Sequence, residues 1–173
     1  MTEKILVTYA TCTGSTAGVA EAISKTLAEG GASVDLRPMR EVTDLGTYRA
    51  VVAGSAVNGG EWLPEAKQFI QTHHMALSQK PFAAFLVCMT LAMPQAEKYR
   101  PFVSDYLKPV RSMVMPVSEG LFAGTLNLSK LPSLSDRLKF GVSVLLGIWK
   151  QGDHRDWNAI RTWAASLSSL LLH

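Results

Sequence analysis

The stretch that decides the fold is TCTGST at residues 11–16, a run of hydroxyl-bearing side chains around one glycine. Residues 4–10 before it (KILVTYA) are rich in β-branched and aromatic side chains and predict a strand. From residue 16 onward, apolar residues recur at the spacing of a helix: Val19, Ala20, Ile23 and Leu27. The stretch is therefore expected to join the end of a strand to the start of a helix.

A loop in this position can hold a phosphate group without a lysine. The first N–H groups of a helix lack backbone partners, and the helix dipole is positive at that end. Glycine lets the backbone approach closely, and the hydroxyl groups can donate to phosphate oxygens. We expect the loop to bind a terminal phosphomonoester such as that of FMN, through Thr11, Cys12, Thr13, Gly14, Ser15 and Thr16. The alternative is that the hydroxyl groups only cap the helix.

Two further loops follow apolar strands, residues 50–54 (AVVAG) and 82–89 (FAAFLVCM). In a parallel sheet these loops lie at the same edge as the first one, so we expect them to flank a flat ring. The residues concerned are Ala56, Val57, Asn58, Gly59, Gly60, Trp62, Thr90, Leu91 and Ala92. Trp62 either stacks on the ring or anchors its own helix, and the sequence does not separate the two.

Strands that alternate with helices predict an α/β fold, a doubly wound parallel sheet of five strands in the order 2-1-3-4-5. The remaining strands are expected at residues 33–37 and 112–117, the latter continued by 121–124. Helices are expected at 64–74, at 94–107 with a break at Pro101, and at 157–172 with Asp156 as N-cap. We expect residues 1–173 to form one domain with an insert at about 125–155.

Composition narrows the function classes. The chain has 173 residues, 47% of them hydrophobic, which is enough for one well-buried domain. Two cysteines and no leader before the first strand predict a cytoplasmic protein, peripheral on the inner face of the membrane if it meets lipid. A net charge of +3 fits an anionic substrate or anionic lipid and is too small to indicate nucleic acid binding. The four histidines are scattered, so no metal site is expected.

The insert contains an apolar segment, residues 134–149 (LSDRLKFGVSVLLGIW), which predicts a helix too short and too charged to span a bilayer. It can rest in a membrane interface, cover the flavin or pack in a dimer. We favour an apolar partner, a lipid, a quinone or a second subunit, over packing within the chain, because the other helices already cover both sheet faces.

Four stretches together resemble one family: residues 11–16, 54–62, 121–131 (LFAGTLNLSKL) and 152–157 (GDHRDW). Over almost the whole chain the sequence is similar to the flavodoxin family, and in particular to its menaquinone-dependent protoporphyrinogen oxidases. The resemblance implies a flavodoxin-like fold, FMN as cofactor, and oxidation of protoporphyrinogen IX with electrons passed to a quinone at the membrane in haem synthesis. Asn58 departs from that subgroup, whose ring loop carries a basic residue.

On this resemblance, we expect an FMN-dependent oxidoreductase whose chemistry takes place on the flavin and needs no catalytic side chain. Contacts to the substrate or the membrane are expected from Lys130, Arg137, Lys139, Trp149 and Arg155, although each of the four charged residues is as well explained as a solvated surface charge. The alternatives are a flavodoxin-type electron carrier, an NAD(P)H-quinone reductase of the same fold, and a binding module without flavin.

Overall fold

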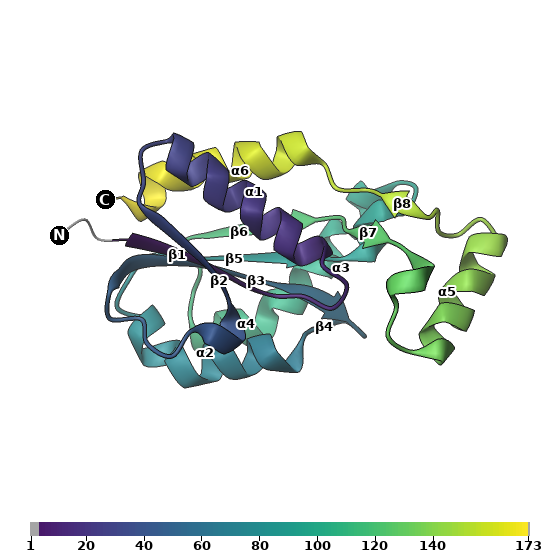
Figure 1. The fold of residues 1–173 in the computed structure, drawn as a ribbon, viewed down its shortest axis with the longest axis horizontal. Coiled ribbons are helices and arrows are strands. Elements are labelled where there is room, and N and C mark those ends of the chain that lie inside the picture. Colours follow the sequence, from purple (N-terminus) through teal and green to yellow (C-terminus); the bar gives the residue numbers. More distant parts are fainter. Residues whose placement is uncertain (1–3, 173) are drawn as a thin grey trace.

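A parallel sheet forms the centre of the computed structural model, which describes residues 4–172 (Figure 1). Its main strands are β1 (Lys4–Ala10), β2 (Val34–Pro38), β3 (Tyr48–Asn58), β5 (Phe82–Val87) and β6 (Ser118–Phe122). They lie in the order β2-β1-β3-β5-β6, and each neighbouring pair is parallel. The predicted order 2-1-3-4-5 is confirmed.

Helices cover both faces of the sheet (Figure 1). On one face, α1 (Ser15–Glu29) and α6 (Trp157–Leu171) pack with Ile5 and Val7 of β1 into one buried cluster. On the other face, α2 (Pro64–Leu77), α3 (Arg100–Ser104) and α4 (Lys108–Met113) pack with Leu6 into a second one. Because β1 is buried on both sides, its run of apolar residues does not alternate with polar ones. Short 3-10 turns complete the connections: η1 (Met39–Glu41), η2 (Met89–Ala92), η3 (Ala96–Tyr99), η4 (Asp105–Leu107) and η5 (Leu128–Lys130).

The position of the last strand was predicted wrongly. Instead of a strand at 112–117, the chain continues α4 to Met113 and begins β6 at Ser118. Val110 and Val114 are buried at a spacing of four, so these apolar residues serve a helical face. Arg111 donates to both carboxylate oxygens of Glu119 at 2.6 Å and ties α4 to β6.

β3 is longer than predicted and ends in a hairpin. It runs to Asn58, turns at Gly59 and Gly60 and pairs antiparallel with β4 (Glu61–Trp62). Both glycines have positive φ, 60° and 79°, which a two-residue hairpin turn of this kind requires. Residues 56–58, expected in a loop, therefore belong to a strand.

The other helix predictions agree with the structure. The segment 94–107 is divided into short pieces, and Pro101 lies in the first turn of α3. Asp156 caps α6, since its Oδ1 accepts the N–H of Ala159 at 2.9 Å.

The insert leaves the sheet through a narrow neck, where β7 (Thr125–Leu126) pairs antiparallel with β8 (Gly152–Asp153). Beyond it, α5 (Leu134–Leu145) extends away from the carboxyl edge of the sheet (Figure 1). α5 ends four residues earlier than predicted, because Gly147 takes a left-handed conformation with φ 74°. None of its residues is buried. Within residues 4–172, no helix is long and apolar enough to cross a bilayer.

Candidate cofactor site

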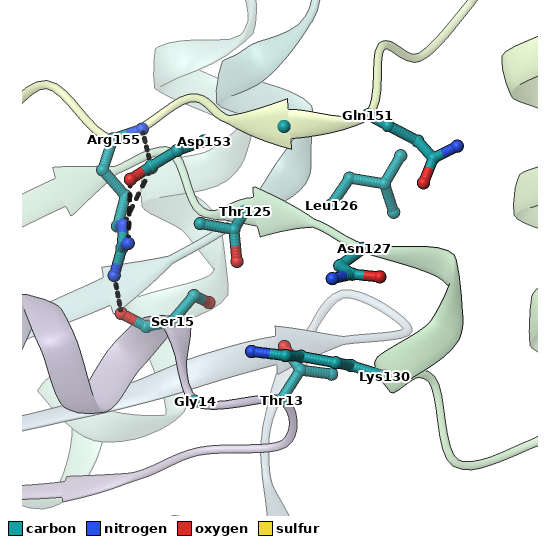
Figure 2. Close-up of a pocket in the computed structure, with 11 residues that line it drawn as sticks. Thr13, Gly14, Ser15, Thr125, Leu126, Asn127, Lys130, Gln151, Asp153 and Arg155 are labelled. Atoms are coloured by element: carbon teal, nitrogen blue, oxygen red, sulfur yellow. Dashed lines mark hydrogen bonds and ion pairs between the residues drawn. The ribbon is translucent and has the colours of Figure 1, made fainter.

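Two adjoining cavities lie where the neck of the insert meets the loop at residues 11–14. The loop cavity, about 440 Å³, is open to the start of α1, and its size is typical of a ligand site. It is lined by Thr13, Gly14, Ser15, Thr125, Leu126, Asn127, Lys130, Gln151, Gly152, Asp153 and Arg155 (Figure 2). The ring cavity, about 130 Å³, is lined by Cys12, Thr13, Ser15, Ala56, Val57, Asn58, Leu63, Val87, Met89, Gly124, Thr125, Leu126, Leu131, Pro132, Asp136 and Phe140. Thr13, Ser15, Thr125 and Leu126 line both cavities, so one extended ligand can occupy the two together.

The start of α1 is left open for an anion. Gly14 precedes the helix with φ 96°, and the space beside its α-carbon is empty to 4 Å. Thr11 Oγ1 accepts the N–H of Gly14 at 3.0 Å and tightens the loop. Within the described part of the chain, no loop hydroxyl accepts an N–H of the first helical turn. The hypothesis that these hydroxyl groups only cap the helix is therefore wrong.

Thr16 supplies a test of whether a phosphate fits. Its side chain is fully buried in the first turn of α1, and its Oγ1 has no partner among residues 4–172. A buried hydroxyl without a partner costs about 1–3 kcal/mol, and a phosphate oxygen would satisfy it. Together with the open N–H groups, this unpaired hydroxyl fits the phosphomonoester end of FMN.

Arg155 joins the neck of the insert to α1. Its Nη1 donates to the carbonyl oxygen of Ser15 at 3.2 Å, while its Nε and Nη2 each donate to Asp153 at 2.8 Å. The guanidinium lies 4.4 Å from the ring centroid of Trp157. Gly18 makes room for it, because a Cβ there would overlap Nη1. Asp153 thus balances the charge of Arg155 at the rim of the loop cavity.

Lys130 brings a second cation to this cavity. In Figure 2 its ammonium group points across the cavity toward Thr13 and Gly14. No ion pair within residues 4–172 balances it. The loop at residues 11–16 contains no lysine, and the insert brings Lys130, expected at the substrate or the membrane, to the loop cavity.

The remaining predicted substrate contacts lie outside both cavities. Arg137 donates to the carbonyl oxygens of Leu131 and Ser129, at 2.8 and 3.2 Å. Trp149 packs on Phe140 with 6.3 Å between ring centroids, and Lys139 is exposed on α5. Arg137 and Trp149 therefore stabilise the insert, and Lys139 remains exposed to solvent.

The ring cavity agrees with the predicted loops only in part. Ala56, Val57 and Asn58 line it, whereas Gly59 and Gly60 form the hairpin turn beyond it. Trp62 is only 3% exposed and lies in the core under α2, so it anchors and does not stack in this structure.

The third predicted loop was placed slightly too late in the chain. Met89 lines the ring cavity, whereas Thr90, Leu91 and Ala92 do not, because η2 turns the chain and buries Leu91. The insert forms a wall of the ring cavity with Asp136 and Phe140, which agrees with the alternative that the segment covers the flavin, although the sequence did not single out these two side chains. Nothing local in the sequence indicates that this wall meets the sheet edge.

The ion pair between Asp153 and Arg155 predicts that the stability of the fold depends on pH. The side-chain hydrogen bonds from Arg155 hold the pKa of the Asp153 carboxyl below its ordinary value of 3.8. The ion pair therefore stabilises the fold fully above this ordinary, unfolded pKa, and the contribution is lost as the pH falls through the lower, folded pKa. Titration followed by NMR should give a pKa for Asp153 below 3.8, rising in Arg155→Gln. An unchanged pKa of Asp153 in that variant would show that Arg155 does not pair with it.

The fold and the site together define a class of protein. A doubly wound sheet with an anion-binding loop after β1 and a ring cavity between the ends of β3 and β5 is typical of flavin-nucleotide proteins. The family model described as flavodoxin domain matches residues 6–143. The chain belongs to the flavodoxin-domain family; its cofactor is FMN, and its role is flavin-based electron transfer.

Solved structures agree with this fold. A flavodoxin of Streptococcus pneumoniae is 16% identical, with a TM-score of 0.60 over 95% of this chain and 97% of that one. A flavodoxin from the domain Archaea is 17% identical, with a TM-score of 0.57 over 98% and 99%. An oxidoreductase from Corynebacterium diphtheriae is 16% identical, with a TM-score of 0.59 over 99% and 98%. No curated protein matches the sequence.

Proposed function

We propose that this protein is an FMN-dependent oxidoreductase that oxidises a porphyrinogen of the protoporphyrinogen IX type and passes the electrons to a quinone. The observation that carries the proposal is the insert, which lines the ring cavity with Leu131, Pro132, Asp136 and Phe140. An electron carrier needs only an exposed ring edge. A dedicated wall beside that edge suits a protein that binds a small molecule there.

The wall suits a large, flat substrate whose anionic groups lie outside the ring cavity, because Asp136 is the one charged side chain among the residues that line it. Bound FMN supplies hydride or single-electron transfer at its isoalloxazine ring. Phe140 offers an aromatic face at the ring cavity, and the neighbouring Lys139 is exposed and suited to a propionate. The chain's own task is then to orient the macrocycle against the ring and to keep water out.

The outer face of α5 suits an anionic membrane surface, where quinones dissolve. Five apolar side chains are 55–88% exposed and follow one another at helical spacing: Leu134, Leu138, Val142, Leu145 and Leu146. Residues 137–150 contain Arg137, Lys139 and Lys150 and no acidic residue. The one acidic residue of α5, Asp136, lines the ring cavity. An apolar stripe accompanied by these three cations complements lipid with negatively charged headgroups.

The donor assay tests the proposed reaction. FMN-loaded protein is mixed anaerobically with protoporphyrinogen IX, or with NADH or NADPH, and the flavin absorbance is followed before menadione is added. We expect the porphyrinogen to bleach the flavin and menadione to restore it over many turnovers. Reduction by a nicotinamide alone would contradict the proposal and favour a quinone reductase, and reduction by neither donor would favour a carrier.

The membrane contact predicts a second result. Leu138→Gln with Leu145→Gln should weaken co-sedimentation with vesicles of anionic lipid at least about tenfold, since a buried leucine is worth about 1.5–3 kcal/mol. Met75→Gln is the matched control, because Met75 is equally exposed on α2, away from the insert.

Equal binding to neutral and anionic vesicles would contradict the membrane contact. A concentration-dependent dimer that the double variant abolishes would contradict it too and would assign the stripe to a second copy of the chain.

A further inference from the structure

Lys130 stands apart from the other cations of the insert, since it alone has an unbalanced charge at the loop cavity. Arg155 is paired with Asp153, and Arg137 donates to two backbone carbonyls. Asp153 is the one acidic side chain among the residues that line this cavity. The cavity therefore holds one positive charge in excess, opposite the positive end of α1.

The backbone around Lys130 is held in place by three sets of bonds. Asn127 Oδ1 accepts the N–H of Ser129 at 3.1 Å and its hydroxyl at 2.6 Å, which fixes the start of η5. Arg137 binds the carbonyl oxygens on either side of Lys130, those of Ser129 and Leu131. The β7–β8 pairing fixes the neck before it. A lysine on so well-braced a turn presents its ammonium to the cavity at little cost in backbone entropy.

We propose that Lys130 binds the phosphate of FMN from the side opposite the loop, so that the cofactor ties the insert to the start of α1. Thr13, Gly14 and Ser15 hold one side of the phosphate, and the ammonium group meets its outer oxygens. The proposal rests on the family's cofactor and is independent of the proposed substrate. Loading of the site with FMN should therefore restrain the insert, whereas riboflavin, which lacks the phosphate, should not.

Flavin affinity tests the contact directly. Apo-protein is titrated with FMN and with riboflavin at low and high salt, and quenching of flavin fluorescence gives the dissociation constants. Lys130→Gln should weaken FMN about tenfold at low salt, less at high salt, and leave riboflavin unchanged. Lys139→Gln removes the same charge from an exposed position on α5 outside both cavities and should leave both affinities unchanged.

A second measurement follows the insert itself. Trypsin should cut within residues 137–150 more slowly when FMN is bound, and riboflavin should give no such protection. In Lys130→Gln the protection by FMN should disappear. Unchanged FMN affinity in Lys130→Gln, an equal loss in Lys139→Gln, or equal protection by riboflavin would each overturn the proposal, whatever the donor assay shows.

Discussion

Replacement of Thr16 by valine is expected to change two quantities in opposite directions. The free energy of unfolding of the apo-protein should rise by about 1–3 kcal/mol, because a fully buried hydroxyl without a partner is removed while the shape of the side chain is kept. FMN should bind about tenfold to a hundredfold more weakly, because a hydrogen bond to a charged phosphate is worth about 1.5–3 kcal/mol. Urea denaturation of the apo-protein and fluorescence titration with FMN measure the two.

Thr8 provides a matched control for this result. Its Oγ1 is likewise buried and without a partner among the described residues, but Thr8 lies within β1, whereas Thr16 lies in the first turn of α1, directly after Ser15 of the loop cavity. Thr8→Val should stabilise the apo-protein by a similar amount and leave FMN affinity unchanged. If Thr16→Val also left FMN affinity unchanged, the Thr16 hydroxyl would have no part in phosphate binding.

The largest loss of stability is expected from Phe85→Ala. Phe85 is fully buried in β5 and packs edge-on against Trp163, 6.2 Å between ring centroids, and close to Phe122 at 6.4 Å. Removal of the ring leaves a cavity on the α1 and α6 face of the sheet, and such truncations cost about 3–5 kcal/mol. Because domains of this kind are stable by about 5–15 kcal/mol, the variant should still fold, with a much lower urea midpoint.

Gly54, on the neighbouring strand β3, tests the packing of the Phe85 ring a second time. A Cβ on Gly54 would overlap three carbons of the Phe85 ring, so Gly54→Ala alone should destabilise the protein by about 1–3 kcal/mol. In the Phe85→Ala background the same methyl group enters the new cavity and should cost little or nothing. Strict additivity of the two changes would contradict this packing.

The sequence was sufficient for the parts of the fold that local pattern controls. The strand before residue 11, the helix after Gly14 and the cap at Asp156 follow from residue type and spacing, and they occur as predicted. The strand expected at 112–117 failed because a short apolar run fits a buried strand and a helical face equally well. The helix is favoured here because Arg111 pairs with Glu119 and because Val110 and Val114 are buried against the core. Both are tertiary contacts that the local sequence does not reveal.

In the candidate site, too, only the part that depends on local sequence could be predicted. The loop at 11–16 could be found from its hydroxyl groups and its place between a strand and a helix. The sequence predicts Lys130 and Arg155 as substrate or membrane contacts, but it does not predict their place beside this loop. Arg155 reaches Ser15 across 140 positions of the chain, and Lys130 follows the β7–β8 pairing that brings the insert to the loop. Trp62 likewise shows its role only when the hairpin pairs Val57 with it and buries the indole.

The phosphate of FMN is expected to bind where β1 passes into α1. The crystal structure of the protein with FMN tests it most directly. The phosphate oxygens should lie about 2.7–3.2 Å from the N–H groups of residues 13–16 and from Thr16 Oγ1, with the flavin ring against residues 56–58. A phosphate bound elsewhere, or a flavin ring outside the ring cavity, would contradict the account.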